Sequence, residues 1–443
     1  MALTFRLTLL VAIFAAAAPA APRNGCPTAP VRSVSAPQMP ADVCIPTGFT
    51  DVPIEFFDDY SWRAFVAMVW PAMPGHRGAA DDVKTIGDGG PRVFETFRAL
   101  WEVFHDDGSA PAADFQAYDG AQNACRAQAK FGDLVLASSS GFGDIGQAAA
   151  GELAGPLAAQ NGRYLRYLTL YNKVAYDYIV ANRLYLRSAL PEVPSPRPVT
   201  PVLRFPDGSV AIKAAWVEMA GLSAEQRARY YTRTAIVRDP GSGRCAPATV
   251  GLVGLHVVQK TASRPQWIWS SFEQVDIAPP ARMNAPGKFL LHDGKPADMP
   301  MENPLPLVPL AREPAKPFNV ERSRSAPIHP KTAVANLLYE RLLEGTVWAN
   351  YQLVVTQWPR LDGDQSVPVP ATQNGDVSNT FPGLGANSAF ANLTMETFDQ
   401  GRPQLGCMSC HNQARMAGDF MWSVLDHAYP AKLGPAASAV RAR

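Results

Sequence analysis

Several features that commonly assign a chain to a class are missing from this sequence. Charged residues make up 18% of its 443 positions, and 40 Lys and Arg stand against 39 Asp and Glu with no basic run. Such a surface offers little to a phosphate backbone, so nucleic acid binding is not predicted. We find no Gly-rich nucleotide loop, no internal repeat and no Ser-His-Asp arrangement with supporting context. Apolar runs after the N-terminus fall short of the roughly 18 residues of a membrane span, so no transmembrane segment is predicted in the mature chain.

Cysteine is scarce, with 6 in the whole chain, and two of them form the most specific pattern present. Cys407, Cys410 and His411 spell C-x-x-C-H, which occurs once. Two thiols at this spacing add across the haem vinyl groups in c-type cytochromes, and the adjacent imidazole becomes an iron ligand. The motif predicts one covalent haem c, attached through Cys407 and Cys410 with His411 as axial ligand. A dihaem peroxidase would need a second copy.

Two other uses of a C-x-x-C pair fit this sequence less well. A structural zinc site needs four ligands, yet the nearest further cysteine is Cys245 and the only close extra histidine is His427. A thioredoxin-like redox pair should open a helix after a strand, early in a compact α/β domain. Haem attachment is therefore the favoured interpretation.

The N-terminus has the pattern of a secretory signal peptide. A positively charged start that includes Arg6 precedes an apolar run at 7–18, which ends in a small-x-small cleavage site at 18–20. We predict that residues 1–20 are a Sec-type bacterial signal peptide. The mature protein is accordingly expected to be periplasmic or secreted.

The four cysteines outside the motif suit an oxidising compartment. An even number of cysteines in an exported chain is typical of disulfides, and four cysteines allow three pairings. We favour a short N-terminal loop closed by Cys26 and Cys44, with Cys125 and Cys245 joining distant parts of the fold. The sequence alone does not decide between the pairings.

Hydrophobic periodicity and the spacing of proline and glycine predict an α+β fold. We expect a helical N-terminal part, an antiparallel β middle part, and a C-terminal haem-binding segment packed on both. The predicted regions are a signal peptide at 1–20, a mainly helical region at 21–200, an antiparallel β region at 201–278, a connector with 12 prolines at 279–330, and a C-terminal region with the haem site at 331–443. Predicted helices cover 60–70, 94–104 and 162–189, and predicted strands cover 209–219, 230–238, 249–260 and 266–276.

The position of the motif distinguishes this chain from a class I cytochrome c domain. In that domain the motif lies near the start, and the sequence after it wraps the porphyrin. Here only 32 residues follow His411, and the four long helices of a bundle cytochrome are also missing. The haem is therefore expected to pack against the preceding parts of the chain.

The second axial position of the iron has few candidates downstream of the motif. Met416, Met421 and His427 are close in sequence. A helix that begins at the proximal histidine would hold all three on the proximal side of the ring, so we discount them. A ligand is more readily supplied from upstream.

Two upstream residues, His256 and Met395, are candidate distal or haem-pocket residues. His256 lies on a predicted hairpin whose second strand carries Trp267 and Trp269 on one face, and Met395 lies in the loop before the motif. A hydrogen-bonded core histidine is the alternative interpretation of His256. An open or water-bound iron position is the alternative to both.

Several segments resemble a family of large secreted bacterial proteins, described as cytochrome c family members with one C-terminal haem motif. The family implies haem binding and electron transfer with a redox partner protein or a small-molecule donor or acceptor. Because shuttling alone needs only about 100 residues, a monohaem oxidoreductase with an open distal position is the alternative. A haem-based sensor is a weaker third class, because no signalling segment is visible. The resemblance rests on Ser61–Ala67 with 70–72, 171–173 with 176–179, 254–258 with 267–273, 351–359, 394–398 and the haem motif.

Overall fold

A computed structural model gives the three-dimensional structure for much of the chain. The predicted signal peptide at 1–20 and much of the predicted connector at 279–330 lie outside the described residues, so neither prediction is tested. The structure describes residues 25–49, 53–137, 156–193, 201–279, 289–295, 316–317, 319–323, 327–358, 391–400 and 407–430.

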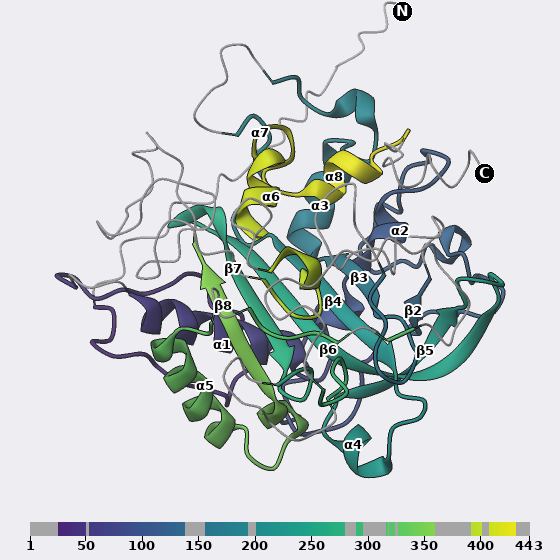
Figure 1. Ribbon diagram of the computed structural model, residues 1–443. Coiled ribbons are helices and arrows are strands. Elements are labelled where there is room, and N and C mark those ends of the chain that lie inside the picture. The colour runs from purple at the N-terminus through teal and green to yellow at the C-terminus, as the bar shows by residue number, and fades with distance from the viewer. Residues whose placement is uncertain are drawn as a thin grey trace, which may run out of the picture.

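A curled, mainly antiparallel sheet forms the centre of the described part of the molecule (Figure 1). Its longest strand, β6, pairs with β4 along one edge and with β5 and then β7 along the other. Among the described strands only β2 and β5 pair in parallel. The strands of this eight-stranded sheet, as far as the chain is described, are β1 (Arg98–Ala99), β2 (Leu134–Leu136), β3 (Arg166–Tyr171), β4 (Val210–Glu218), β5 (Thr232–Arg238), β6 (Cys245–Thr261), β7 (Arg264–Gln274) and β8 (Tyr351–Gln357).

Helices lie on both faces of the sheet. In Figure 1 the C-terminal helices, in yellow, lie near β7 and α3, whereas α1 and α5 lie together beside β8. Within the described ranges every helix is too short or too polar to span a bilayer. The α-helices are α1 (Ile54–Val69), α2 (Leu100–Val103), α3 (Lys173–Ala181), α4 (Ala224–Ala228), α5 (Pro330–Leu342), α6 (Cys407–Gln413), α7 (Arg415–Gly418) and α8 (Trp422–His427). Short 3₁₀ helices cover Val93–Thr96, Gly120–Gln122, Arg187–Ala189, Val347–Asn350 and Thr397–Asp399.

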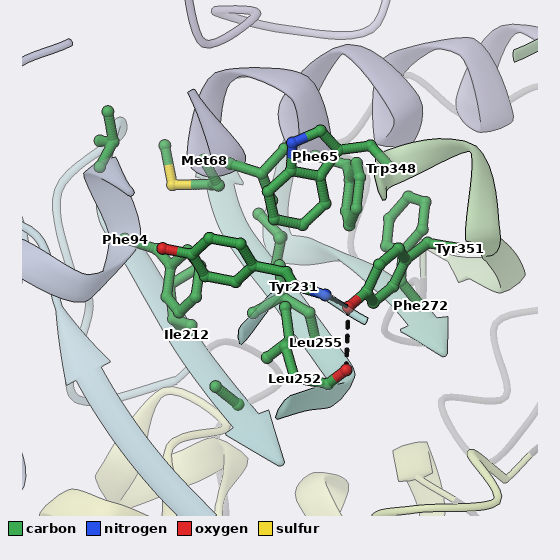
Figure 2. Packing of buried hydrophobic residues seen from close by; sticks show 14 of the residues in the cluster. Phe65, Met68, Phe94, Ile212, Tyr231, Leu252, Leu255, Phe272, Trp348 and Tyr351 are labelled. Atoms are coloured by element: carbon green, nitrogen blue, oxygen red, sulfur yellow. Dashed lines mark hydrogen bonds between the residues drawn. The ribbon is translucent and has the colours of Figure 1, made fainter. Parts of the chain in front are cut away.

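The largest hydrophobic cluster fills the space between α1 and one face of the sheet. Figure 2 shows Phe65 of α1 beside Phe272 of β7, with Trp348 from the 3₁₀ helix before β8 and Tyr351 at the start of β8. The Phe65 and Phe272 ring centroids are 4.5 Å apart. Because side chains alternate along a strand, the residues between these core positions on β6 and β7 face the C-terminal helices instead.

The predicted helix at 60–70 is confirmed, although it begins earlier. α1 starts at Ile54 and ends at Val69, where Trp70 takes an extended conformation before Pro71. Proline cannot continue a helix because it lacks the backbone N–H and clashes with the preceding turn. Most of α1 is buried, which makes it an internal helix packed between α5 and the sheet.

The predicted helix at 162–189 is wrong. Residues 166–171 instead form β3, which is paired with both β1 and β4. Helix α3 starts only afterwards, where the Asn172 side chain accepts a hydrogen bond from the Ala175 N–H, and it ends before Arg183, which has a positive φ of 54°. Leu and Tyr at mixed spacing fit a strand that is buried on both faces as well as they fit a helix.

The predicted helix at 94–104 is wrong as a single element. The segment is divided into a 3₁₀ turn, the short strand β1 and α2. Two glutamates account for the division, because Glu95 accepts a hydrogen bond from the Arg92 N–H and Glu102 accepts one from the Ala99 N–H. Each carboxylate thereby caps its own short helical turn.

The four predicted strands of the middle part are confirmed as β4, β5, β6 and β7. Strands β4, β5 and β7 each pair with β6 in antiparallel orientation. The predicted hairpin is also confirmed, with Thr261 paired to Arg264 and two residues in the turn. β6 begins at Cys245, four residues before the predicted strand, because its first residues pair with β5.

Both disulfides have the favoured pairing. Cys26 and Cys44 are joined with 5.4 Å between their Cα atoms, and Cys125 and Cys245 are joined with 5.7 Å. The second bond connects the loop before β2 to the start of β6, so it closes a stretch of 120 residues. It therefore ties the β2 and β5 end of the sheet to the longest strand.

Candidate functional site

The residues of the C-x-x-C-H motif lie on α6. Cys407 and Cys410 are one turn apart, and His411 follows at the fourth position after Cys407, so all three share one side of the helix. Neither thiol takes part in a disulfide. The indole N–H of Trp422 donates to the Cys410 carbonyl at 2.9 Å and joins α6 to α8.

His411 is held as a neutral imidazole with a defined tautomer. Its Nδ1 lies 2.7 Å from the Phe420 carbonyl oxygen, an acceptor, so Nδ1 carries the proton. Burial lowers the pKa of His411 to about 4. The lone pair is therefore on Nε2, which is the nitrogen and the protonation state that ligation of iron requires. This donor set fits a haem iron.

The two thiols are unlike those of a redox-active pair. Burial raises the pKa of Cys407 above its usual range and raises the pKa of Cys410 to about 11, so both are protonated thiols at neutral pH. Thioredoxin-like cysteines need the opposite shift, because the thiolate is their nucleophile.

A narrow pocket lies between α6 and the sheet. The hairpin of β6 and β7 forms one wall, and its cross-strand pairs set His256 beside Ser271 and Val258 beside Trp269. The Trp269 and His411 ring centroids are 4.5 Å apart, so this indole packs against the imidazole of the motif. The lining residues are His256, Val258, Trp269, Ser270, Ser271, Gln357, Glu396, Cys407 and His411.

His256, predicted as a haem-pocket residue, lies in the same pocket as Cys407 and His411. Burial lowers its pKa, although Glu396 opposes the shift, so the ring is neutral at pH 7. Its Nε2 is buried and has no hydrogen-bond partner among the described residues, and Glu396 Oε2 is 3.6 Å away. Lys213 is the cross-strand partner of His256 in the pairing of β4 with β6. Its Nζ lies 3.9 Å from Oε1 of Glu396.

Met395, the other predicted candidate, lies elsewhere. Its side chain is fully buried in a hydrophobic cluster with Val253 and Leu393, and it is absent from the described lining of the pocket. Met421, which the sequence analysis discounted, packs in a cluster with Trp267 on the α3 side. The structure therefore brings His256, and not Met395, to the motif.

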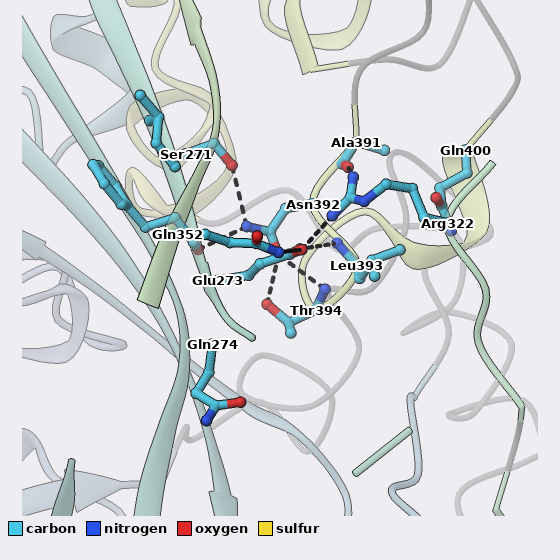
Figure 3. A network of polar contacts seen from close by, with 12 residues as sticks. Ser271, Glu273, Gln274, Arg322, Gln352, Ala391, Asn392, Leu393, Thr394 and Gln400 are labelled. Carbon is cyan, nitrogen blue, oxygen red and sulfur yellow. Dashed lines mark hydrogen bonds and ion pairs between the residues drawn. The ribbon is translucent and has the colours of Figure 1, made fainter. Parts of the chain in front are cut away.

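A polar network fastens the loop before the motif to the sheet (Figure 3). Glu273 of β7 pairs with Arg322 and accepts a hydrogen bond from the Leu393 N–H at 3.3 Å. The Asn392 side chain donates to the Phe272 carbonyl at 2.8 Å. Because the same loop carries Glu396, these contacts fix the carboxylate beside His256.

Sequence reasoning missed Glu396, Lys213 and the residues of this network. They form no motif, and they come from β4, from β7 and from segments far apart in the sequence, including the loop at 391–400. Glu396 stands next to Met395 in a segment that was noticed only as part of the family resemblance. Its role in the pocket depends on long-range pairing that no local pattern encodes.

Comparisons with models of protein families, with curated proteins and with solved structures found no match to this chain. Only the residues of the chain itself therefore indicate its function.

Proposed function

We propose that this protein is a periplasmic or secreted monohaem c-type cytochrome that transfers electrons to or from a redox partner. Cys407 and Cys410 would hold the haem through thioether bonds, and His411 would be the proximal ligand. The observation that carries the proposal is the hydrogen bond from His411 Nδ1 to the Phe420 carbonyl, because it leaves the lone pair of Nε2 available to iron on the same helical turn as two thiols that are not in a disulfide.

A haem bound at this position would supply a one-electron iron couple. The residues of the chain bind and orient it. Phe420 fixes the tautomer and orientation of the His411 ring, Trp269 packs against that ring, and the β6 and β7 hairpin forms one wall of the pocket. Hydrogen bonding and packing around an iron ligand help to set the reduction potential of the iron.

A monohaem oxidoreductase, either peroxidase-like or oxidising another small molecule, is the second candidate. The observation that favours it is the group formed by His256, Glu396 and Lys213 in the same pocket. A neutral imidazole beside a carboxylate can accept and return a proton, which a catalyst of small-molecule oxidation needs and an electron carrier does not. In this case the distal iron position would be open or exchangeable.

Covalent attachment is tested by expression in a bacterium with c-type maturation, followed by extraction in acid acetone. The wild-type protein should keep its haem, and the Cys407→Ala/Cys410→Ala variant should lose it. Cys26→Ala/Cys44→Ala is the matched control, since it also removes two cysteines but should retain haem. Non-extractable haem in the Cys407→Ala/Cys410→Ala variant would disprove the proposal.

The two candidates are distinguished by carbon monoxide. Added to the reduced wild-type protein, it should leave the optical spectrum unchanged if a protein ligand fills the distal position, as the electron-transfer proposal expects. A rapid change to a carbonyl spectrum would favour the oxidoreductase, because it requires an open or exchangeable position.

A further inference from the structure

The turn that brings the Phe420 carbonyl to His411 is conformationally strained. Asp419 has φ 48° and ψ 47°, and Phe420 has φ 71°, so two consecutive residues with side chains are in the left-handed region. This conformation costs roughly 1–2 kcal/mol per residue relative to the right-handed one. Other contacts must therefore hold the turn in place.

Those contacts converge on the Asp419 side chain. It is fully buried, it accepts a hydrogen bond from the Phe205 N–H at 2.8 Å, and it forms an ion pair with Lys260. Lys260 is also buried and lies at the end of β6, with its ammonium 5.6 Å from the ring centroid of Trp267. The turn is thus fixed to the same strand that brings His256 to the pocket.

Stability alone gives a weak reason for this ion pair. Burial lowers the pKa of Lys260 and raises the pKa of Asp419, so desolvation disfavours the charged form of each partner. Apolar residues of similar volume often stabilise a fold as well as a buried ion pair does, whereas an ion pair fixes geometry more narrowly. Asp419 is next to Phe420 in the chain, so the ion pair also fixes the position of the Phe420 carbonyl that contacts His411.

We propose that Lys260 and Asp419 are positioning residues that set the strength of the hydrogen bond between His411 and Phe420 and, through it, the reduction potential of the iron. The inference rests on the proposed function. A short, well-aligned bond at Nδ1 makes the imidazole a stronger donor at Nε2 and so stabilises the oxidised iron. Loosening the turn lengthens the bond and raises the potential.

The test compares wild-type holoprotein with Lys260→Met and Asp419→Asn. Both variants should retain covalent haem and have a more positive reduction potential in a redox titration. The His411 Nδ1 proton, followed by NMR of the reduced protein, should exchange with solvent at least about tenfold faster. Lys173→Met is the matched control, because Lys173 forms an exposed ion pair with Asp177 on α3 and its removal should change neither quantity.

Asp419→Asn keeps an oxygen acceptor for the Phe205 N–H, so it tests the inference even if Lys260→Met does not fold. A lower melting temperature with wild-type potential and wild-type proton exchange would overturn the inference and leave the pair a purely structural role. Absence of covalent haem from the wild-type protein would instead disprove the proposed function, so the two failures are distinguishable.

Discussion

At the scale of single residues, His411 and His256 differ in the partners of their ring nitrogens. The Nδ1–H of His411 donates a hydrogen bond to the Phe420 carbonyl, whereas the Nε2 of His256 has no hydrogen-bond partner in the part of the chain that the structure describes and lies near Glu396. Both rings are neutral at pH 7 because burial lowers both pKa values. Under the proposed function, the first would be a permanent ligand of the iron, and the second would bind iron or bind and release a proton.

The assignment of the distal side can be tested by His256→Ala. If His256 acts at the haem, the optical and electron paramagnetic resonance spectra of the iron should change in this variant, towards high spin if the ring is a ligand. Met395→Leu is the control and should leave both spectra unchanged, because Met395 lies in the hydrophobic cluster outside the pocket. An unaltered spectrum in the His256→Ala variant would show that this ring does not act at the iron.

A second prediction at this scale concerns Asp58, a fully buried carboxyl group on α1. Burial raises its pKa from 3.8 to about 7, although hydrogen bonds from the Thr332 and Thr356 hydroxyls oppose the shift. The protonated form is thus favoured in the folded state. Its contribution to the free energy of unfolding, on the order of 4 kcal/mol, is fully present below about pH 4 and is lost as pH rises through about 7.

Asp58→Asn carries a neutral amide at every pH and should remove this dependence. Urea unfolding midpoints measured at pH 5 and pH 8 should differ in the wild type, with the lower midpoint at pH 8, and should differ much less in the variant. An equally large decrease in both proteins would show that other groups cause it.

At the scale of elements, the sequence correctly predicted the helices and strands whose residue pattern fits only one type of secondary structure. The strands at β4 to β7 alternate or are rich in β-branched residues, and Pro71 marks the end of α1. The error at 162–189 arose because β3 is covered on both faces, so its pattern lacks the alternation that marks a half-exposed strand. β4, β6 and β7 are also largely buried on both faces, and their Val, Ile and Trp residues identified them as strands, whereas β3 contains no Val or Ile.

The loop at 391–400 packs closely against Gly254 on β6. A Cβ atom at this position would lie 2.1 Å from Thr394 Oγ1 and 3.1 Å from the terminal methyl of Met395. Gly254→Ala should therefore displace the loop, lower the free energy of unfolding by about 1–3 kcal/mol as overpacking does, and alter the iron spectrum through Glu396.

Gly251→Ala on the same strand is the matched control. The new methyl group would meet the flexible end of Met219, which can move aside. Its cost should be smaller, and the iron spectrum should stay the same. Equal spectral changes in the two variants would contradict the role assigned to the loop.

At the scale of the whole molecule, the candidate site combines residues from distant parts of the chain. The sheet takes strands from β1 at residues 98–99 to β8 at 351–357, and the pocket joins β6, β7 and β8 to α6. The motif could be predicted because its chemistry is local. The group of His256, Glu396 and Lys213 could not, because only the pairing of β4 with β6 and the anchoring of the loop bring these residues together.

The two disulfides give a final prediction on this scale. Removing a crosslink raises the entropy of the unfolded chain, which lowers the free energy of unfolding by about 5 kcal/mol for the 120-residue stretch and about 3 kcal/mol for the 18-residue stretch. Cys125→Ala/Cys245→Ala should therefore lower the free energy of unfolding more than Cys26→Ala/Cys44→Ala, as measured by urea unfolding with tryptophan fluorescence. Both variants should retain covalent haem under native conditions, because neither pair lines the pocket as described. A larger loss in the Cys26→Ala/Cys44→Ala variant would show that the N-terminal segment contributes more to stability than its short loop implies.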